Sequence, residues 1–196
     1  MTSHTEQGFV VAIGASAGGI KAIRALLSCL PANLGAPVVI AMHSEPSSNL
    51  TEVLQIRSPL AIKRLEDGEA LRTGQIYVVP GATHAFFRDG RVRLSEPVRD
   101  SGFRPSIDGL FMTLAAEYKE KAIAVVLSGT MNDGTRGAQV VYDMGGQTIV
   151  QNPEDATFES MPLSVILMDH PQQILSAEDL GSWLDETIGT APPGPA

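Results

Sequence analysis

Residues 9–27 read FVVAIGASAGGIKAIRALL, and this stretch decides the fold. Residues 9–13 form an unbroken apolar run, which is typical of a strand buried on both faces of a parallel sheet. A glycine-rich loop follows at residues 14–19, and apolar residues then recur at helical spacing until Pro31 ends the pattern. A second apolar run at residues 38–42 completes a strand–helix–strand unit, which predicts a parallel sheet with right-handed connections.

The second half of the chain repeats this alternation, whereas the middle differs. Short apolar runs flank Asp89-Gly90, a dipeptide that favours a tight hairpin turn, so we expect an antiparallel hairpin around residues 75–95. The predicted fold class is therefore α/β, with a doubly wound, mainly parallel sheet flanked by helices. The same patterns predict helices at residues 50–57, 107–118, 135–144 and 162–168 and after Ser176, and strands at residues 75–79, 122–127 and 147–150.

The chain has 196 residues, which suits one domain of about 100–200 residues. We place this domain at residues 8–188 and expect flexible termini at residues 1–7 and 189–196, where the last residues read APPGPA. Cys29 is the single cysteine, which excludes an internal disulfide and a multi-cysteine zinc site. With no His-x₃-His pair either, the sequence predicts no metal ion. The leading interpretation below also requires no cofactor.

The formal net charge is −8, which argues against nucleic acid as a partner. Apolar runs are far shorter than the roughly 20 residues that cross a bilayer, so we expect a protein that is not inserted in a membrane. The absence of a signal peptide and the lone cysteine predict a cytoplasmic location. Residues 57–104 hold nine Lys or Arg against six Asp or Glu, so this stretch forms either a basic docking patch or an ordinary solvated surface.

Three chemically reactive side chains follow three predicted strands. Ser16 lies in the glycine-rich loop after the first strand, His43 follows the second, and Asp133 lies in a loop after the strand at residues 122–127. Ligands of open parallel sheets bind beyond the carboxyl ends of the strands, so we expect these residues to meet there. A histidine can activate a serine hydroxyl and an aspartate can orient the histidine, which predicts a catalytic triad.

The start of the predicted helix offers a second element of such a site. Its unpaired N–H groups near Ala17 and Gly18 could hold the oxyanion of a tetrahedral intermediate. Each triad residue also has a purely structural interpretation: a serine in a tight turn, a histidine at a strand end and an aspartate before glycine. His84 follows Pro-Gly-Ala-Thr, and we favour a role in that turn over a place in the cleft. Met131 is the methionine expected to line the cleft.

The glycine-rich loop also allows a dinucleotide-binding interpretation, because it joins a strand to a helix. Two departures oppose this alternative. Ser16 replaces the middle glycine of the fingerprint, and Met42-His43-Ser44 replaces the acidic residue that normally ends the second strand. Glu45, just beyond, keeps a nucleotide-binding oxidoreductase open as a remote alternative.

Several motifs resemble those of the CheB-type chemotaxis protein-glutamate methylesterases, and the resemblance covers about residues 8–185. The family's serine loop, Gly-Ala-Ser-Thr-Gly-Gly, appears here as GASAGG with Ser16, and its strand-end histidine appears as His43. Its aspartate loop appears as LSGTMNDG with Asp133. The remaining matches are IYVVPGATH at residues 76–84, RPSID at residues 104–108, QTIVQ at residues 147–151 and Met161-Pro162.

This resemblance implies a serine hydrolase that removes γ-methyl esters from glutamates of chemoreceptors, releases methanol and in some members deamidates glutamines. It implies that Ser16 is the nucleophile, His43 the base and Asp133 the orienting group. The implied partners are the methylated cytoplasmic helices of chemoreceptors, and a separate receiver or histidine-kinase protein. Only seven residues precede the domain, so we expect no receiver domain in this chain, which is either free-standing or a fragment.

The chain departs from the family pattern around its site. Ala17 replaces the threonine after the nucleophile, and Thr130-Met131 replaces Met-Gly in the aspartate loop. We assign Ala17, Gly18, Thr130 and Met131 to the oxyanion or substrate site, together with Arg104 of the basic stretch. The altered loop supports an alternative function, in which a catalytically reduced member acts as a docking or regulatory module.

Overall fold

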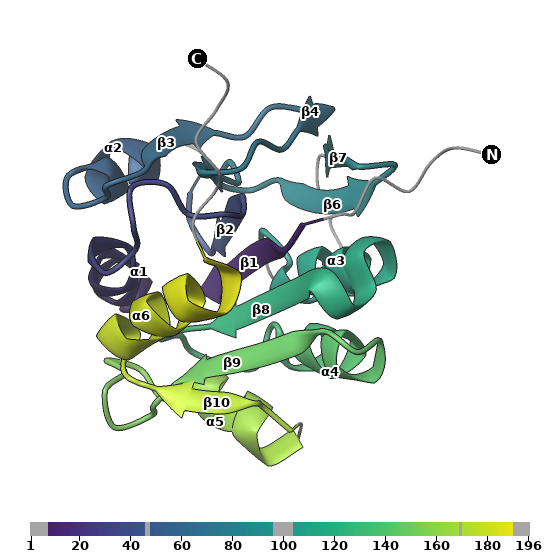
Figure 1. Cartoon of the computed structure of the whole chain (residues 1–196). Coiled ribbons are helices and arrows are strands. Elements are labelled where there is room, and N and C mark those ends of the chain that lie inside the picture. The colour runs from purple at the N-terminus through teal and green to yellow at the C-terminus, as the bar shows by residue number, and fades with distance from the viewer. Residues whose placement is uncertain (1–7, 46–47, 96–103, 169, 190–196) are drawn as a thin grey trace.

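The computed structural model describes residues 8–45, 48–95, 104–168 and 170–189. These residues form a seven-stranded sheet and a smaller three-stranded sheet (Figure 1). The strands are β1 (Val10–Ala15), β2 (Val38–Met42), β3 (Ala61–Arg64), β4 (Glu69–Ala70), β5 (Gln75–Val78), β6 (His84–Arg88), β7 (Arg91–Ser95), β8 (Ala122–Val126), β9 (Gln147–Gln151) and β10 (Gln173–Leu175). The helices are α1 (Gly19–Ser28), α2 (Leu50–Gln55), α3 (Ile107–Tyr118), α4 (Thr135–Asp143), α5 (Ser160–Met168) and α6 (Ala177–Ile188), with a 3-10 turn, η1, at Lys119–Lys121.

The large sheet has the strand order β10-β9-β8-β1-β2-β5-β3, and every pairing in it is parallel. Its centre consists of β8, β1 and β2, whose residues are all buried because helices cover both faces. Along β1, Val11 and Ile13 face one apolar cluster while Val10 and Ala12 face the other. The predicted doubly wound α/β fold is therefore confirmed.

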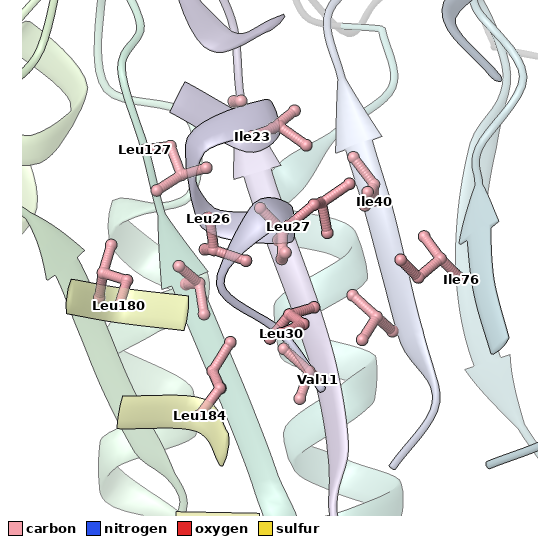
Figure 2. Packing of buried hydrophobic residues seen from close by; sticks show 14 of the residues in the cluster. Val11, Ile23, Leu26, Leu27, Leu30, Ile40, Ile76, Leu127, Leu180 and Leu184 are labelled. Carbon is pink, nitrogen blue, oxygen red and sulfur yellow. The ribbon is translucent and has the colours of Figure 1, made fainter. Parts of the chain in front are cut away.

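The first face of the sheet is covered by α1, α2 and α6, and the second by α3, α4 and α5. In Figure 2, Ile23, Leu26 and Leu27 of α1 and Leu180 and Leu184 of α6 point at the side chains of the central strands. The apolar residues of α1 recur at intervals of three and four, so they form one stripe, and that stripe is buried against the sheet.

The hairpin is confirmed over β6 and β7, which pair antiparallel and join β4 in the smaller sheet. Its turn places Asp89 and Gly90 at φ 53° and 70°, the left-handed conformation that a two-residue hairpin turn needs. The expectation that the hairpin extends back to residue 75 is wrong. Strand β5 lies between β2 and β3 in the parallel sheet, where its apolar residues are buried, and Pro80 follows and cannot donate to a ladder.

Other predicted elements end within two residues of the observed ones, and the helix predicted after Ser176 is confirmed as α6, with the Ser176 side chain accepting the Asp179 N–H. The sequence did not predict β3, β4 or β10. These strands lie at sheet edges, are two to four residues long and carry exposed residues, so they lack an apolar run. Gly189, the first residue of the predicted C-terminal tail, accepts a hydrogen bond from the Gly35 N–H; the rest of both predicted tails lies outside the described residues.

Among the described residues, no helix is both long enough and apolar enough to cross a membrane.

Candidate active site

The site lies where the three central strands end. In the sheet, β1 lies between β8 and β2, and the register places Ala15 beside Met42 and Gly14 beside Val126. Strand ends at the same level bring the residues that follow them to one edge. The structure therefore brings together Ser16, His43 and Asp133, which lie far apart in sequence.

A continuous chain of hydrogen bonds joins the three side chains. The Nδ1 atom of His43 lies 3.1 Å from the Oγ of Ser16, and Nε2 lies 2.8 Å from Oδ2 of Asp133. Because a carboxylate only accepts, we assign the ring proton to Nε2, which leaves Nδ1 to accept the serine proton. The histidine side chain is 17% exposed and the aspartate 2%, so solvent reaches the histidine while the carboxylate is shielded.

The carboxylate of Asp133 is held by the start of α3. Its Oδ2 accepts the backbone N–H of Ile107 and its Oδ1 accepts that of Asp108, both at 2.9 Å. The Oγ of Ser106 accepts the next unpaired amide, that of Gly109. Helix N-termini carry unpaired donors and a partial positive charge, so α3 stabilises the ionised aspartate and fixes its plane.

The turn that carries Ser16 is fixed by the loop after β8. The Ser16 N–H donates to the carbonyl of Ser128, and the Ser128 hydroxyl donates to the carbonyl of Ala17 at 2.8 Å. Ser128 is fully buried and its hydroxyl also accepts the Phe158 N–H. These contacts connect the serine loop to two distant segments, so the position of Ser16 does not depend on its own loop alone.

Gly18 is the N-cap of α1 and adopts φ 74°, a conformation that glycine reaches without strain. In the described residues, neither the Ala17 N–H nor the Gly18 N–H donates to an acceptor of the protein, whereas the Ser16 N–H does. The N–H groups of Ala17 and Gly18 are therefore available to a ligand beside Ser16.

The aspartate loop is exposed at its tip. Thr130 is exposed, and Met131 is 62% exposed with φ 68°, which is uncommon for a residue with a side chain. Met131 thus lies at the rim, in the loop that leads to Asp133, and its carbonyl accepts a long hydrogen bond of 3.4 Å from the Ser164 hydroxyl of α5. Gly129, just before, approaches Ser16 so closely that an added Cβ would lie 3.0 Å from the serine Cβ.

The prediction that His84 belongs to the turn after Pro80 is wrong, because His84 lies in a strand. It is the first residue of β6, it is 7% exposed, and its Nδ1 accepts the Ser106 N–H at 3.0 Å. Burial lowers the pKa of His84 below its usual 6.5, and the positive charge of Arg104 lowers it further, while the charge of Asp133 raises it. His84 thus lies beside Ser106 at the start of α3, and Arg104 is close enough to influence its pKa.

Sequence reasoning assigned no role to Ser128, Ser106 or Asp108, although all three lie in motifs it had singled out. The contacts of Ser128 and Asp108 join residues that are far apart in the chain, so no local pattern reveals them. Ser106 caps α3 through Gly109, three residues on, so a serine before an apolar helical pattern was the local signal for it. Within the described residues, no group of three or more His, Cys, Asp or Glu side chains could hold a metal ion.

The fold and this geometry define an α/β protein with a Ser–His–Asp arrangement of the kind that serine hydrolases use. Residues 11–184 match the family model described as CheB methylesterase, and the chain belongs to this family. Membership in this family excludes the oxidoreductase alternative. The structure agrees, because Ser16, which occupies the position of the middle glycine in the dinucleotide-binding fingerprint, contacts His43.

Curated relatives support the assignment. The chain is 34% identical over 178 residues to protein-glutamate methylesterase/protein-glutamine glutaminase 4 of Myxococcus xanthus, which covers 89% of this chain and 50% of the relative. It is 33% identical to the Thermotoga maritima protein-glutamate methylesterase/protein-glutamine glutaminase, covering 96% of this chain and 56% of that one. The chain therefore spans about half the length of these curated relatives.

Two shorter proteins match over most of their length. A putative protein-glutamate methylesterase/protein-glutamine glutaminase of Leptospira interrogans is 34% identical and covers 87% of this chain and 90% of its own. The crystal structure of the Thermotoga maritima CheB methylesterase catalytic domain superimposes with a TM-score of 0.88 at 34% identity. It covers 93% of this chain and 100% of its own, so the fold corresponds to that whole domain.

Proposed function

We propose that this chain is a serine hydrolase that removes γ-methyl esters from glutamate side chains of chemoreceptors and releases methanol. The observation that carries the proposal is the hydrogen-bonded sequence Ser16–His43–Asp133 in a member of the CheB methylesterase family. The names of the relatives support the same activity and add glutamine deamidation. We include that second reaction, because an ester and an amide are attacked in the same way.

In the first half of the reaction, the Oγ of Ser16 attacks the γ-carbonyl carbon of the methylated glutamate. Its proton passes to Nδ1 of His43, which lies 3.1 Å from Oγ. The same proton then goes to the departing methoxide, which leaves as methanol, and the glutamyl group remains as an ester on Ser16. With a glutamine side chain, ammonia leaves instead.

In the second half, water attacks the ester on Ser16 while Nδ1 of His43 takes its proton. The proton returns to Oγ of Ser16 as the carbon–oxygen bond breaks, which frees the glutamate side chain. Each time the imidazole gains a proton, the Asp133 carboxylate 2.8 Å from Nε2 stabilises the positive ring.

Both halves pass through a tetrahedral intermediate with a negative oxygen. We assign its stabilisation to the N–H groups of Ala17 and Gly18, which precede α1 and have no acceptor within the described residues. Thr130 and Met131 border the same site from the aspartate loop, and we assign them to contacts with the substrate. Removing one donor of this kind lowers turnover by about 10²–10³-fold in other enzymes.

The proposed partners are the methylated cytoplasmic helices of chemoreceptors, with a separate receiver or histidine-kinase protein as regulator and the cytoplasm as location. The charge distribution supports this choice. Residues 57–104 carry a net charge of +3 while the chain as a whole carries −8, so this stretch favours an acidic partner. Arg104, at its end, lies close enough to His84 to lower the pKa of that histidine.

The test is methanol release from methylated receptor membranes, with Ser16→Ala compared with wild type. A matched control is Ser28→Ala at the end of α1, because this exposed hydroxyl makes only local contacts among the described residues, with the carbonyl of Ala25 and the Sγ of Cys29. We expect release by wild type and by the control and none by Ser16→Ala. If folded wild type releases no methanol from cognate membranes, the esterase proposal fails and the docking-module alternative takes its place.

A further inference from the structure

The N-termini of α3 and α4 are each capped by an aspartate from the start of the other helix. Asp133, which directly precedes the start of α4, accepts the first two amides of α3, those of Ile107 and Asp108. In return, Oδ1 of Asp108 accepts the N–H of Gly137 in the first turn of α4 at 2.7 Å. The first amides of a helix have no acceptor within that helix, and here the carboxylates of Asp133 and Asp108 accept them for α3 and α4 respectively.

The mechanism uses Asp133 but gives Asp108 no task. Burial is the largest influence on Asp108 and raises its pKa above the usual 3.8, and the charge of Asp133 acts in the same direction. Hydrogen bonds from the amides of Gly137 and Gly134 and the positive charge of Arg136 oppose this effect. The hydrogen bond from the Gly137 amide places the Asp108 carboxylate at the start of α4, where it can fix the backbone that follows Asp133.

The backbone next to Asp133 is tightly packed on the same helix. A Cβ added to Gly134 would lie 2.8 Å from the Ile107 side chain, and one added to Gly137 would lie 2.9 Å from the Asp108 carbonyl. Residue 133 is thereby fixed at two points: its own carboxylate binds the start of α3, and the chain just after it is bound by Asp108. Loss of the second contact leaves the start of α4 free to shift, and residue 133 with it.

We propose that Asp108 is a positioning residue, which holds the start of α4 so that Oδ2 of Asp133 faces Nε2 of His43. This inference rests on the proposed function, because it assumes that Ser16 is activated through His43. Asp108 touches neither the substrate nor the reacting atoms and acts through Asp133. What matters is the acceptor oxygen that receives the Gly137 amide, so a neutral acceptor of the same shape preserves the function.

The decisive comparison is Asp108→Ala against Asp108→Asn. Asparagine retains the Oδ1 acceptor, whereas alanine removes it. Glu117 provides a matched control pair, Glu117→Ala and Glu117→Gln, because Glu117 also accepts a backbone N–H across segments, that of Gly90 at 2.7 Å. Glu117 lies in the last turn of α3, at the opposite end of the helix from Asp108.

The first readout is the rate at which a fluorophosphonate ester modifies Ser16. In this reaction the serine oxygen bonds to phosphorus, fluoride leaves and the serine proton goes to His43, so the rate reports activation of the nucleophile without any receptor. A misplacement near 1 Å can lower rates by about 10²-fold, so we expect Asp108→Ala to label about 10–100-fold more slowly. Asp108→Asn should stay within about threefold of wild type, since a neutral hydrogen bond replaces a charge-assisted one.

The second readout is the split between kcat and KM for methanol release, with thermal unfolding to verify folding. For Asp108→Ala we expect a lower kcat, an unchanged KM and faster amide exchange at Gly137, with Asp108→Asn restoring all three. Labelling of folded Asp108→Ala at the wild-type rate overturns the inference, and so does equal slowing of both Asp108 variants. If wild type labels but releases no methanol, the proposed substrate is wrong, while the labelling order of the variants still decides the role of Asp108.

Discussion

Gly18→Ala tests how tightly the serine loop is packed against the loop after β8. Gly18 adopts φ 74°, and a Cβ built there would lie 2.6 Å from Oγ of Ser128 and 2.7 Å from Cβ of Thr157. The Ser128 hydroxyl cannot move away easily, because it is buried and hydrogen-bonded to Ala17 and Phe158. The added methyl group therefore meets atoms that hold Ser16 in place.

Two contributions to the loss of stability can be separated. A side chain in the left-handed conformation costs about 1–2 kcal/mol. Forcing a methyl group into a well-packed site adds about 1–3 kcal/mol. Gly18→Ala should therefore lower the free energy of unfolding by about 2–5 kcal/mol, where each kcal/mol corresponds to roughly 2–4 °C in Tm for a chain of this size.

The assay is urea denaturation of wild type, Gly18→Ala and Gly90→Ala. Gly90 is the matched control: its φ is 70°, and an added Cβ would find nothing within 4 Å. It measures the backbone contribution alone, which we expect to be about 1–2 kcal/mol. The difference between the variants then measures the packing contribution at the serine loop.

Gly18→Ala should also slow fluorophosphonate labelling of Ser16, while Gly90→Ala should not. The reasoning is refuted if both variants lose the same stability. It is equally refuted if Gly18→Ala loses the additional stability but labels Ser16 at the wild-type rate, because the loop then yields without moving the nucleophile.

Three further predictions concern the triad, its surroundings and a remote helix. Asp133→Asn should lower kcat for methanol release by about 10³–10⁴-fold, because both carboxylate oxygens of Asp133 accept hydrogen bonds and an amide has only one acceptor oxygen, so the Nε2–H tautomer of His43 loses its support. A much smaller loss in steady-state kinetics, at equal protein stability, would contradict this. Because the pKa of His84 is lowered in the folded state, its contribution to stability is complete above about pH 6.5 and is lost as the pH falls below that value. The unfolding free energy of His84→Gln should therefore decline less steeply than that of wild type between about pH 6.5 and 5, by up to about 1.4 kcal/mol per pH unit. Parallel curves for the two proteins in urea titrations would contradict this. Ser176→Ala should cost about 1 kcal/mol by removing the cap of α6, with Ser16 labelling unchanged, and a labelling defect would show that this helix start influences the site.

Local patterns carried much of the prediction. The apolar runs of β1, β2 and β8 indicated a buried parallel sheet, and the residues after them indicated the edge where the site lies. Each signal is contained in about ten residues, because strand burial and helix spacing are properties of neighbouring side chains. The same holds for the Asp89-Gly90 turn and the Ser176 cap.

Local patterns failed where a strand or a side chain depends on distant partners. The pattern of β5 predicts a strand but not its partner, because a short apolar run is the same whether the neighbouring strand is parallel or antiparallel, so the prediction that β5 belongs to the hairpin is wrong. The Pro-Gly-Ala-Thr sequence before His84 predicts a turn, whereas the contact of its buried ring is with the start of α3, more than 20 positions away.

The sequence by itself determined the α/β alternation, the strand ends that carry Ser16, His43 and Asp133, and the family to which these motifs belong. Only the tertiary structure decided which ring nitrogen faces the serine, how Ser128 fixes the serine loop, and that Asp108 and Asp133 cap each other's helices. The physical reason is that these are hydrogen bonds between segments separated by more than 20 residues. Their geometry is set by how the helices pack on the sheet, and no local pattern of residues encodes that packing.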